Sequence, residues 1–216
     1  MDLLHLLSWT CIVLTLGMFS TGLVDLKKMQ KTKSTDNIQF LPFLITCASN
    51  LGWLYYGMLK NDSTIMVVNL TGALLQTLYI LVYLKYTKQK RDVVFQMVAV
   101  SAVGTSAGLY FVLFLPPGSI QLNQLGLFCS VTTVGVYLSP LADLVAIVRS
   151  GDVQRLSFPL TVATFFTCTS WVLYGYQLND YYILVPNLPG IITSIIRFYL
   201  FRKYASSGPS YKSMYV

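Results

Sequence analysis

The sequence predicts an all-α polytopic membrane protein with seven transmembrane helices. Mean hydropathy is +0.61, and 55% of the 216 residues are hydrophobic while only 11% are charged. A soluble domain could not keep so apolar a surface in solution. Apolar stretches near the roughly 20 residues that a helix needs to cross a bilayer recur along the chain. The sequence also repeats itself, with residues Gly17–Tyr86 matching Gly135–Tyr204.

Seven apolar stretches without Asp, Lys or Arg follow one another, and each is a predicted span. They are Leu3–Val24, Phe40–Leu59, Ser63–Leu84, Val93–Leu115, Leu122–Ala142, Leu156–Leu178 and Tyr181–Ile196. No basic segment precedes the first stretch and no small-residue cleavage site follows it, so it is expected to be a span rather than a signal peptide.

The basic residues predict the orientation of these spans. All but one of the 15 lysines and arginines lie after spans one, three, five and seven, and only Lys60 lies on the opposite side. Basic residues are retained on the cytoplasmic side of membranes. The N-terminus is therefore expected outside or in a lumen, and the C-terminus in the cytoplasm. The net charge of +7 is then a topology signal, and nucleic-acid binding is excluded as a function.

The repeat accounts for the odd number of spans. Spans one to three and five to seven carry the matching residues, whereas span four matches neither copy. Three spans reverse the direction of the chain, so an additional crossing is needed before the second copy can run parallel to the first. The predicted domains are a first three-helix repeat (3–90), an inversion linker helix (91–118), a second three-helix repeat (119–204) and a disordered cytoplasmic tail (205–216), a 3+1+3 arrangement.

Two asparagines and two tryptophans form the predicted substrate site. At a rise of about 1.5 Å per residue, Trp53 and Trp171 reach the same depth in the outer half of the membrane as Asn69 and Asn187. An amide both donates and accepts hydrogen bonds, as sugar hydroxyls require, and an indole offers a flat apolar surface. Taken singly, each tryptophan could be an interfacial anchor and each asparagine a helix–helix contact.

Specific motifs occur in both copies of the repeat. The second copy contains Ser139-Pro140-Leu141, Phe158-Pro159, Trp171-x-x-Tyr174-Gly175 and Pro186-Asn187, and the first echoes them as Leu41-Pro42-Phe43, Trp53-x-x-Tyr56-Gly57 and Val68-Asn69. In these motifs the chain resembles the SWEET sugar-transporter family over about residues 8–204. The resemblance implies passive, bidirectional movement of mono- or disaccharides.

Prolines near the inner ends of the spans predict the moving parts. Pro42, Pro140 and Pro159 are expected to kink their helices as hinges of an inner gate, because proline removes a backbone hydrogen bond. The resemblance implies a ring of four such prolines, but the fourth position is Gly22, which also weakens a helix. It further suggests an outer gate formed by Tyr56 and Asp180, although Asp180 could instead be a solvated loop carboxylate.

Missing residue types narrow the function. The chain contains no glutamate, no Asp lies in the middle of a span, and the single histidine is His5. Coupled carriers place an ionisable group within the membrane, so an uncoupled facilitator is expected. Neither a metal nor another cofactor is expected, and no enzyme activity is predicted.

The sequence thus predicts a sugar uniporter that works by alternating access. Its expected partners are a glucose-like sugar and the lipid bilayer, with a homo-oligomer left open. Its expected location is the plasma membrane, the Golgi membrane or both, and Tyr211–Met214 in the tail matches a sorting-signal pattern. Three alternatives remain: a seven-span receptor, disfavoured by the short loops and the repeat; a membrane adaptor that regulates a partner through its tail; and a proton-coupled PQ-loop-type carrier.

Overall fold

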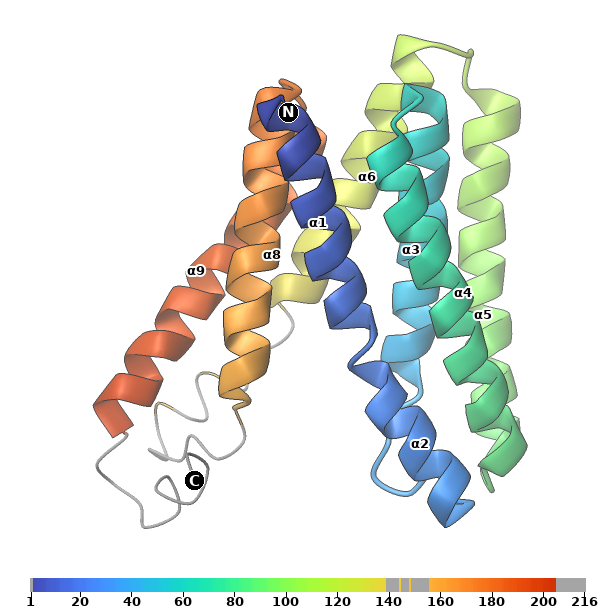
Figure 1. Ribbon diagram of the computed structural model, residues 1–216. Coiled ribbons are helices and arrows are strands. Elements are labelled where there is room, and N and C mark those ends of the chain that lie inside the picture. Colours follow the sequence, from blue (N-terminus) through green and yellow to red (C-terminus); the bar gives the residue numbers. More distant parts are fainter. Residues whose placement is uncertain (1, 139–143, 145–147, 149–155, 205–216) are drawn as a thin grey trace. The chain divides into compact units, whose positions relative to one another are not determined.

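A computed structural model describes residues 2–138, 144, 148 and 156–204, and these residues form helices, turns and loops without any strand (Figure 1). The helices are α1 (Leu3–Phe19), α2 (Gly22–Thr32), α3 (Leu41–Lys60), α4 (Ser63–Tyr86), α5 (Lys90–Leu109), the π-helical turn η1 (Tyr110–Phe114), α6 (Ser119–Leu138), α8 (Phe158–Gln177) and α9 (Tyr181–Tyr204). The predicted all-α fold class is confirmed, and each helix of 17 residues or more overlaps a predicted span.

Several of these helices are long and apolar enough to cross a membrane. Among the described residues, four segments meet both conditions: Leu3–Thr32, Ser63–Tyr86, Lys90–Phe114 and Tyr181–Tyr204. Helices α3, α6 and α8 have 20 residues each. At about 1.5 Å per residue they also reach the roughly 30 Å thickness of the hydrocarbon core.

The first predicted span is interrupted. Helix α1 ends at Phe19 and α2 begins at Gly22, with a turn at Ser20 and Thr21 between them. The hydroxyls of Ser20 and Thr21 donate to the carbonyls of Leu16 and Met18 over 2.8 and 2.7 Å. Such bonds compete with the backbone ladder. The predicted span over Leu3–Val24 therefore contains a turn that the sequence did not predict, and the lysine-rich segment that follows is helical.

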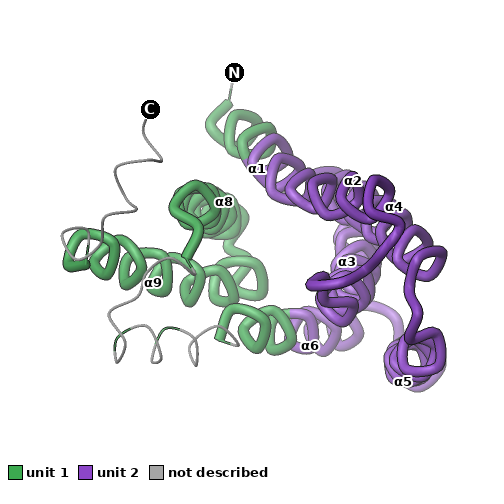
Figure 2. Tube along the Cα trace, turned by 90° about the horizontal axis from the view of Figure 1, so that it is seen from below, with its two compact units in different colours: residues 1–10, 130–216 green, residues 11–129 purple. Residues whose placement is uncertain are grey.

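The chain divides into two compact units (Figure 2). Unit 1 comprises Met1–Thr10 and Ser130–Val216, and unit 2 comprises Cys11–Cys129. In unit 2, α4 packs against α3 and α2, and α3 also packs against α5. In unit 1, α8 packs against α9 in the same way as the equivalent pair α3 and α4. The boundaries of the sequence repeats remain a prediction.

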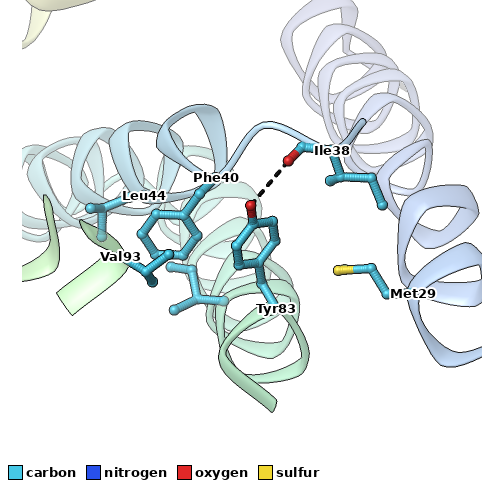
Figure 3. Packing of buried hydrophobic residues seen from close by; sticks show 7 residues of the cluster. Met29, Ile38, Phe40, Leu44, Tyr83 and Val93 are labelled. Atoms are coloured by element: carbon cyan, nitrogen blue, oxygen red, sulfur yellow. Dashed lines mark hydrogen bonds between the residues drawn. The ribbon is translucent and has the colours of Figure 1, made fainter. Parts of the chain in front are cut away.

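The core of unit 2 is best developed where the loop between α2 and α3 meets the end of α4 (Figure 3). Tyr83 of α4 donates through its hydroxyl to the carbonyl of Ile38 over 3.1 Å, and its ring centroid lies 4.9 Å from that of Phe40. Aromatic pairs of this kind contribute about 0.5–1.5 kcal/mol beyond their buried area. In unit 1, the equivalent residues Phe158 and Phe201 pack edge to face at 5.2 Å.

Candidate functional site

Asn69 lies in the second turn of α4, and the start of that helix is tightly fixed. The chain leaves α3 through Asn61, whose φ of 57° is one that asparagine tolerates better than most residues. Asp62 then caps α4, because its Oδ1 accepts from the backbone N–H groups of Thr64 and Ile65 at 2.9 and 3.1 Å. Only Asn61 and Asp62 connect α3 to α4, which is the short end of the range for two antiparallel helices. This short, capped connection fixes where α4 starts, and so fixes the position of Asn69 relative to α3.

The same connection precedes Asn187 in unit 1. Asn179 has a φ of 53°, and the Oδ1 of Asp180 accepts from the backbone N–H groups of Tyr182 and Ile183 at 3.0 and 3.3 Å. The side chain of Asp180 is only 4% exposed. The alternative interpretation of Asp180 as a solvated loop carboxylate is therefore wrong, since it is a buried cap of α9. Its role in an outer gate stays a prediction.

Each candidate asparagine is anchored to its own helix in the same way. The Nδ2 group of Asn69 donates to the carbonyl of Ile65, and that of Asn187 donates to the carbonyl of Ile183, both over 2.8 Å. Asn69 is 8% exposed and Asn187 is half-buried. A side-chain amide carries two donor hydrogens and one acceptor oxygen. This anchor therefore uses one donor and leaves the oxygen and the second donor for a ligand.

The candidate tryptophans are also held alike. Trp53 contacts Tyr56 edge to face with centroids 5.5 Å apart, and Trp171 contacts Tyr174 edge to face at 5.7 Å. Both tyrosines are buried, whereas both indoles are half-buried. A buried tyrosine thus supports an indole that retains part of its surface for other contacts. Tyr56, the predicted outer-gate residue, also lies below the Lys60 ammonium group, which is 5.9 Å from the centre of its ring.

Within unit 2, Trp53 and Asn69 lie at the same level of the antiparallel pair α3 and α4. The two helices come close to each other at two points, one on either side of this level. A Cβ added to Gly57 would lie 3.0 Å from Cγ2 of Ile65, and one added to Gly72 would lie 2.5 Å from Nδ2 of Asn50. Trp53 is between Asn50 and Gly57 on α3, and Asn69 is between Ile65 and Gly72 on α4.

Unit 1 repeats this arrangement with Trp171 and Asn187. A Cβ added to Gly175 of α8 would lie 2.9 Å from the backbone nitrogen of Leu184, and one added to Gly190 of α9 would collide with Sγ of Cys168. Trp171 is between Cys168 and Gly175, and Asn187 is between Leu184 and Gly190. The structure therefore places an asparagine and a tryptophan at one level in each unit.

Two of the predicted hinge prolines do not kink their helices. Pro42 and Pro159 occupy the first turns of α3 and α8. The N–H groups of a first turn have no partner within the helix, so proline removes no intrahelical hydrogen bond there. The kinking mechanism expected for these two residues is therefore wrong, and their effect is to fix the start of each helix. Pro140 lies outside the described residues.

Gly22 lies at the interruption between α1 and α2. A Cβ at this position would lie 2.5 Å from the ring of Tyr79, whose hydroxyl donates to the carbonyl of Phe19 over 3.0 Å. Glycine is thus required by the close approach of the fully buried Tyr79. The interruption between α1 and α2 is thus supported by a side chain from α4.

Two structural features of α9 were not predicted from the sequence. Pro186 and Pro189 lie inside this helix, on either side of Asn187, where proline does remove intrahelical hydrogen bonds. The hydroxyl of Ser130, from α6, donates to the carbonyl of Tyr182 over 2.7 Å. The prolines were visible in the sequence as helix breakers within a predicted span. No sequence signal connects Ser130 with α9.

The candidate residues are amides and indoles, and the described residues around them form no candidate metal site. Among residues 2–138, 144, 148 and 156–204, no group of three His, Cys, Asp or Glu side chains is placed to hold a metal ion. The arrangement can offer hydrogen bonds from amides and apolar contact from indoles. These groups can bind a polar, uncharged ligand with both hydroxyl and C–H surfaces.

Known proteins resemble this chain in sequence. The family described as "Sugar efflux transporter for intercellular exchange" matches it twice, over residues 5–91 and 123–208. Proteins named sugar transporter SWEET1 are similar over most of their length: the one from Danio rerio is 60% identical over 98% of each chain, and the one from Homo sapiens is 56% identical over 90% of this chain and 88% of its own.

A solved structure, described as that of a eukaryotic SWEET transporter at 3.7 Å resolution, is similar in fold. It has a TM-score of 0.86 at 25% identity and covers 94% of this chain and 97% of its own. The chain is therefore an integral membrane transporter rather than an enzyme, and it belongs to the SWEET family of sugar transporters.

Proposed function

We propose that this protein is a passive, bidirectional uniporter that moves mono- or disaccharides across a membrane by alternating access. The observation that carries the proposal is the repeated pair of an asparagine and a tryptophan at one level in each unit. The proposed sugar-binding residues are Asn69 and Trp53 of the first repeat and Asn187 and Trp171 of the second. A glucose-like sugar is the proposed substrate.

The chemistry of the anchored amides supports this assignment. Because Nδ2 of each asparagine is fixed by its own helix over 2.8 Å, the amide oxygen is held in one orientation without a ligand. A pre-oriented acceptor loses less conformational entropy when it binds a hydroxyl. The half-buried indoles supply apolar contact to the C–H face of a sugar ring.

The positions of the carboxylates support transport without proton coupling. Asp25 and Asp92 lie in the first turns of α2 and α5, and Asp62 and Asp180 cap α4 and α9. In the described part of the chain, no carboxylate lies in the middle of a helix. Coupled carriers depend on an ionisable group within the membrane. Sugar flux is therefore expected to be independent of a pH gradient.

The proposed gates use both ends of the helices. The proposed inner-gate residues are Gly22, Pro42, Pro140 and Pro159, with Pro42 and Pro159 acting as rigid helix starts rather than kinks. The proposed outer-gate residues are Tyr56 and Asp180. The N-terminus is proposed to lie outside or in a lumen and the C-terminus in the cytoplasm. The protein is proposed to act in the plasma membrane, the Golgi membrane or both, with a homo-oligomer as an open possibility.

The decisive experiment is counterflow of radiolabelled glucose in liposomes that contain the purified protein, with and without an imposed pH gradient. We expect counterflow of equal rate in both conditions. Asn187→Ala and Trp171→Ala are expected to abolish it at unchanged protein content. Thr164→Ala is the matched control, because the Thr164 hydroxyl bonds the Leu160 carbonyl of its own helix and lies outside the proposed site.

Other results of the counterflow experiment would favour one of the alternative functions or contradict the proposed site. A rate that follows the pH gradient would indicate a proton-coupled PQ-loop-type carrier. If neither glucose, galactose, fructose nor sucrose shows counterflow, the result would favour a membrane adaptor. Normal counterflow in well-incorporated Asn187→Ala protein would contradict the proposed site while leaving sugar transport intact.

A further inference from the structure

Helix α9 contains a proline immediately before the proposed substrate residue Asn187. Pro186 is fully buried inside α9 and has no backbone N–H. In a regular helix, residue 186 would donate to the carbonyl of residue 182. Proline therefore removes the helix's own donor to the carbonyl of Tyr182.

A side chain from α6 supplies a donor to this carbonyl. The hydroxyl of Ser130 donates to the carbonyl oxygen of Tyr182 over 2.7 Å, and Ser130 is only 7% exposed. Both residues belong to unit 1. A buried hydroxyl thus takes the place of the backbone N–H that Pro186 lacks.

The first repeat provides an internal comparison. At the shift of 118 residues, Pro186 corresponds to Val68 and Ser130 corresponds to Ile12. Val68 retains its N–H, and Ile12 has no hydroxyl. The proline that removes the helix's donor and the serine that supplies one occur together in one copy and are absent together from the other.

The same turn of α9 holds the side chain of Asn187. Nδ2 of Asn187 donates to the carbonyl of Ile183, the residue next to Tyr182, and Asp180 accepts from the N–H groups of both Tyr182 and Ile183. Three side chains therefore fix this turn, and one of them is the proposed sugar ligand. A shift of the Tyr182 carbonyl would move the anchor of Asn187 directly.

We propose that Ser130 is a positioning residue for sugar binding: its hydroxyl replaces the hydrogen bond that Pro186 removes and so holds the turn of α9 that orients the Asn187 amide. This inference rests on the proposed function, because it takes Asn187 as a sugar ligand. Ser130 itself does not touch the sugar.

The test is a double-mutant cycle with Ser130→Ala and Pro186→Val, with the apparent KM and the maximal rate of sugar counterflow as readouts. Loss of one hydrogen bond that orients a ligand is expected to raise the apparent KM of Ser130→Ala about two- to ten-fold with little change in maximal rate. In the Pro186→Val background the backbone N–H is restored. Ser130→Ala should then change the apparent KM less than about two-fold, since no donor is missing. Thr164→Ala serves again as the control.

The same four proteins give a readout that does not depend on transport. Thermal unfolding in detergent should show the same coupling, with Ser130→Ala lowering Tm when Pro186 is present and not in the Pro186→Val background. An unchanged apparent KM in Ser130→Ala, or an equal rise in both backgrounds, would overturn the proposal. A lower Tm with unchanged apparent KM would assign Ser130 a purely structural role and also overturn it. If Asn187→Ala transports normally, the proposed function fails at the site, whatever the result for Ser130.

Discussion

Helices α4 and α9 occupy equivalent places in the two repeats and carry equivalent asparagines, but their backbones differ. Both run for 24 residues, both begin after an aspartate cap, and both anchor the asparagine amide to the carbonyl four residues earlier over 2.8 Å. Around Asn69, however, α4 has Val68 and Thr71, whereas α9 has Pro186 and Pro189 around Asn187.

The difference shows that one side-chain geometry can be supported in two ways. In α4 the helix's own hydrogen bonds maintain the turn that carries Asn69. In α9 part of this support comes from Ser130 of a neighbouring helix. A bond between two helices can break without unwinding either one. The turn that carries Asn187 therefore depends on a contact from another helix, whereas the turn that carries Asn69 does not, and the following substitutions test this contrast.

Val68→Pro should have the largest effect, because it imposes the α9 sequence on α4. The substitution removes a hydrogen bond within the helix, and Ile12 offers no hydroxyl to replace it. A proline in a helix interior costs about 3 kcal/mol or more. Thermal unfolding of the purified protein in detergent should show a large decrease in Tm or failure to fold.

Val68→Ala is the control for this experiment. Val68 is 2% exposed, so alanine reduces packing while keeping the backbone N–H. Val68→Pro must be clearly less stable than Val68→Ala. Equal Tm values for the two variants would mean that α4 tolerates proline as well as α9 does, and the contrast between the helices would be lost.

Gly175→Ala should destabilise the protein more than Gly57→Ala, although the two glycines are equivalent. A Cβ at Gly175 would lie 2.9 Å from the backbone nitrogen of Leu184 and 3.0 Å from the backbone oxygen of Asp180, whereas one at Gly57 would meet side-chain atoms of Ile65 at 3.0 and 3.1 Å. Side chains can move and the capped backbone cannot. We expect a cost of about 3 kcal/mol for Gly175→Ala and about 1 kcal/mol for Gly57→Ala, within the range for overpacking.

Size-exclusion chromatography after heating gives the comparison directly. The fraction of Gly175→Ala protein that remains monodisperse should fall at a lower temperature than that of Gly57→Ala. The reverse order would show that the α8–α9 connection adapts more readily than the α3–α4 connection.

Asn50→Cys should stabilise unit 2 modestly by giving it the residue of unit 1. Asn50 is 4% exposed, and its Nδ2 atom has no hydrogen-bond partner in the described part of the chain. The equivalent residue, Cys168, is hydrogen-bonded to the hydroxyl of Tyr137 at 3.2 Å. A buried, unpaired polar group costs about 1–3 kcal/mol. We expect Tm of Asn50→Cys to rise by a few degrees, and a fall would indicate that the amide has a partner that the cysteine cannot replace.

Much of this fold could be predicted because its main signals are local. The bounds of α3 and α4 differ from the predicted spans by two residues or fewer, since the Asn61-Asp62 connection and the charged residues mark their ends. The interruption at Ser20 was missed because it depends on Tyr79, a residue almost 60 positions away that fills the space beside Gly22.

Within each unit, the level of each candidate tryptophan beside its candidate asparagine could be predicted from the sequence, whereas their role in sugar binding stays a prediction. The repeat and the helical rise were sufficient to pair Trp53 with Asn69 and Trp171 with Asn187. The kink expected at Pro42 is absent because Pro42 is the second residue of α3, where proline removes no intrahelical hydrogen bond. Ser130 could not be found, because its contact with Tyr182 crosses 52 residues and leaves no periodic pattern.

Lys33→Gly should have the smallest effect, and it tests the same contrast at the other end of the repeats. Lys33 ends α2 with a φ of 54°, a left-handed conformation that favours glycine, and the second repeat has Gly151 at this position. Glycine relieves the backbone strain but gives up the bond from the Lys33 ammonium to the Tyr86 hydroxyl at 3.2 Å. That contact is exposed and contributes little, so we expect a net stabilisation of about 0.5 kcal/mol. Tyr86→Phe isolates the contact and should leave Tm nearly unchanged. A decrease in Tm for Lys33→Gly with no change for Tyr86→Phe would show that the flexibility of glycine in the unfolded chain outweighs the strain of Lys33.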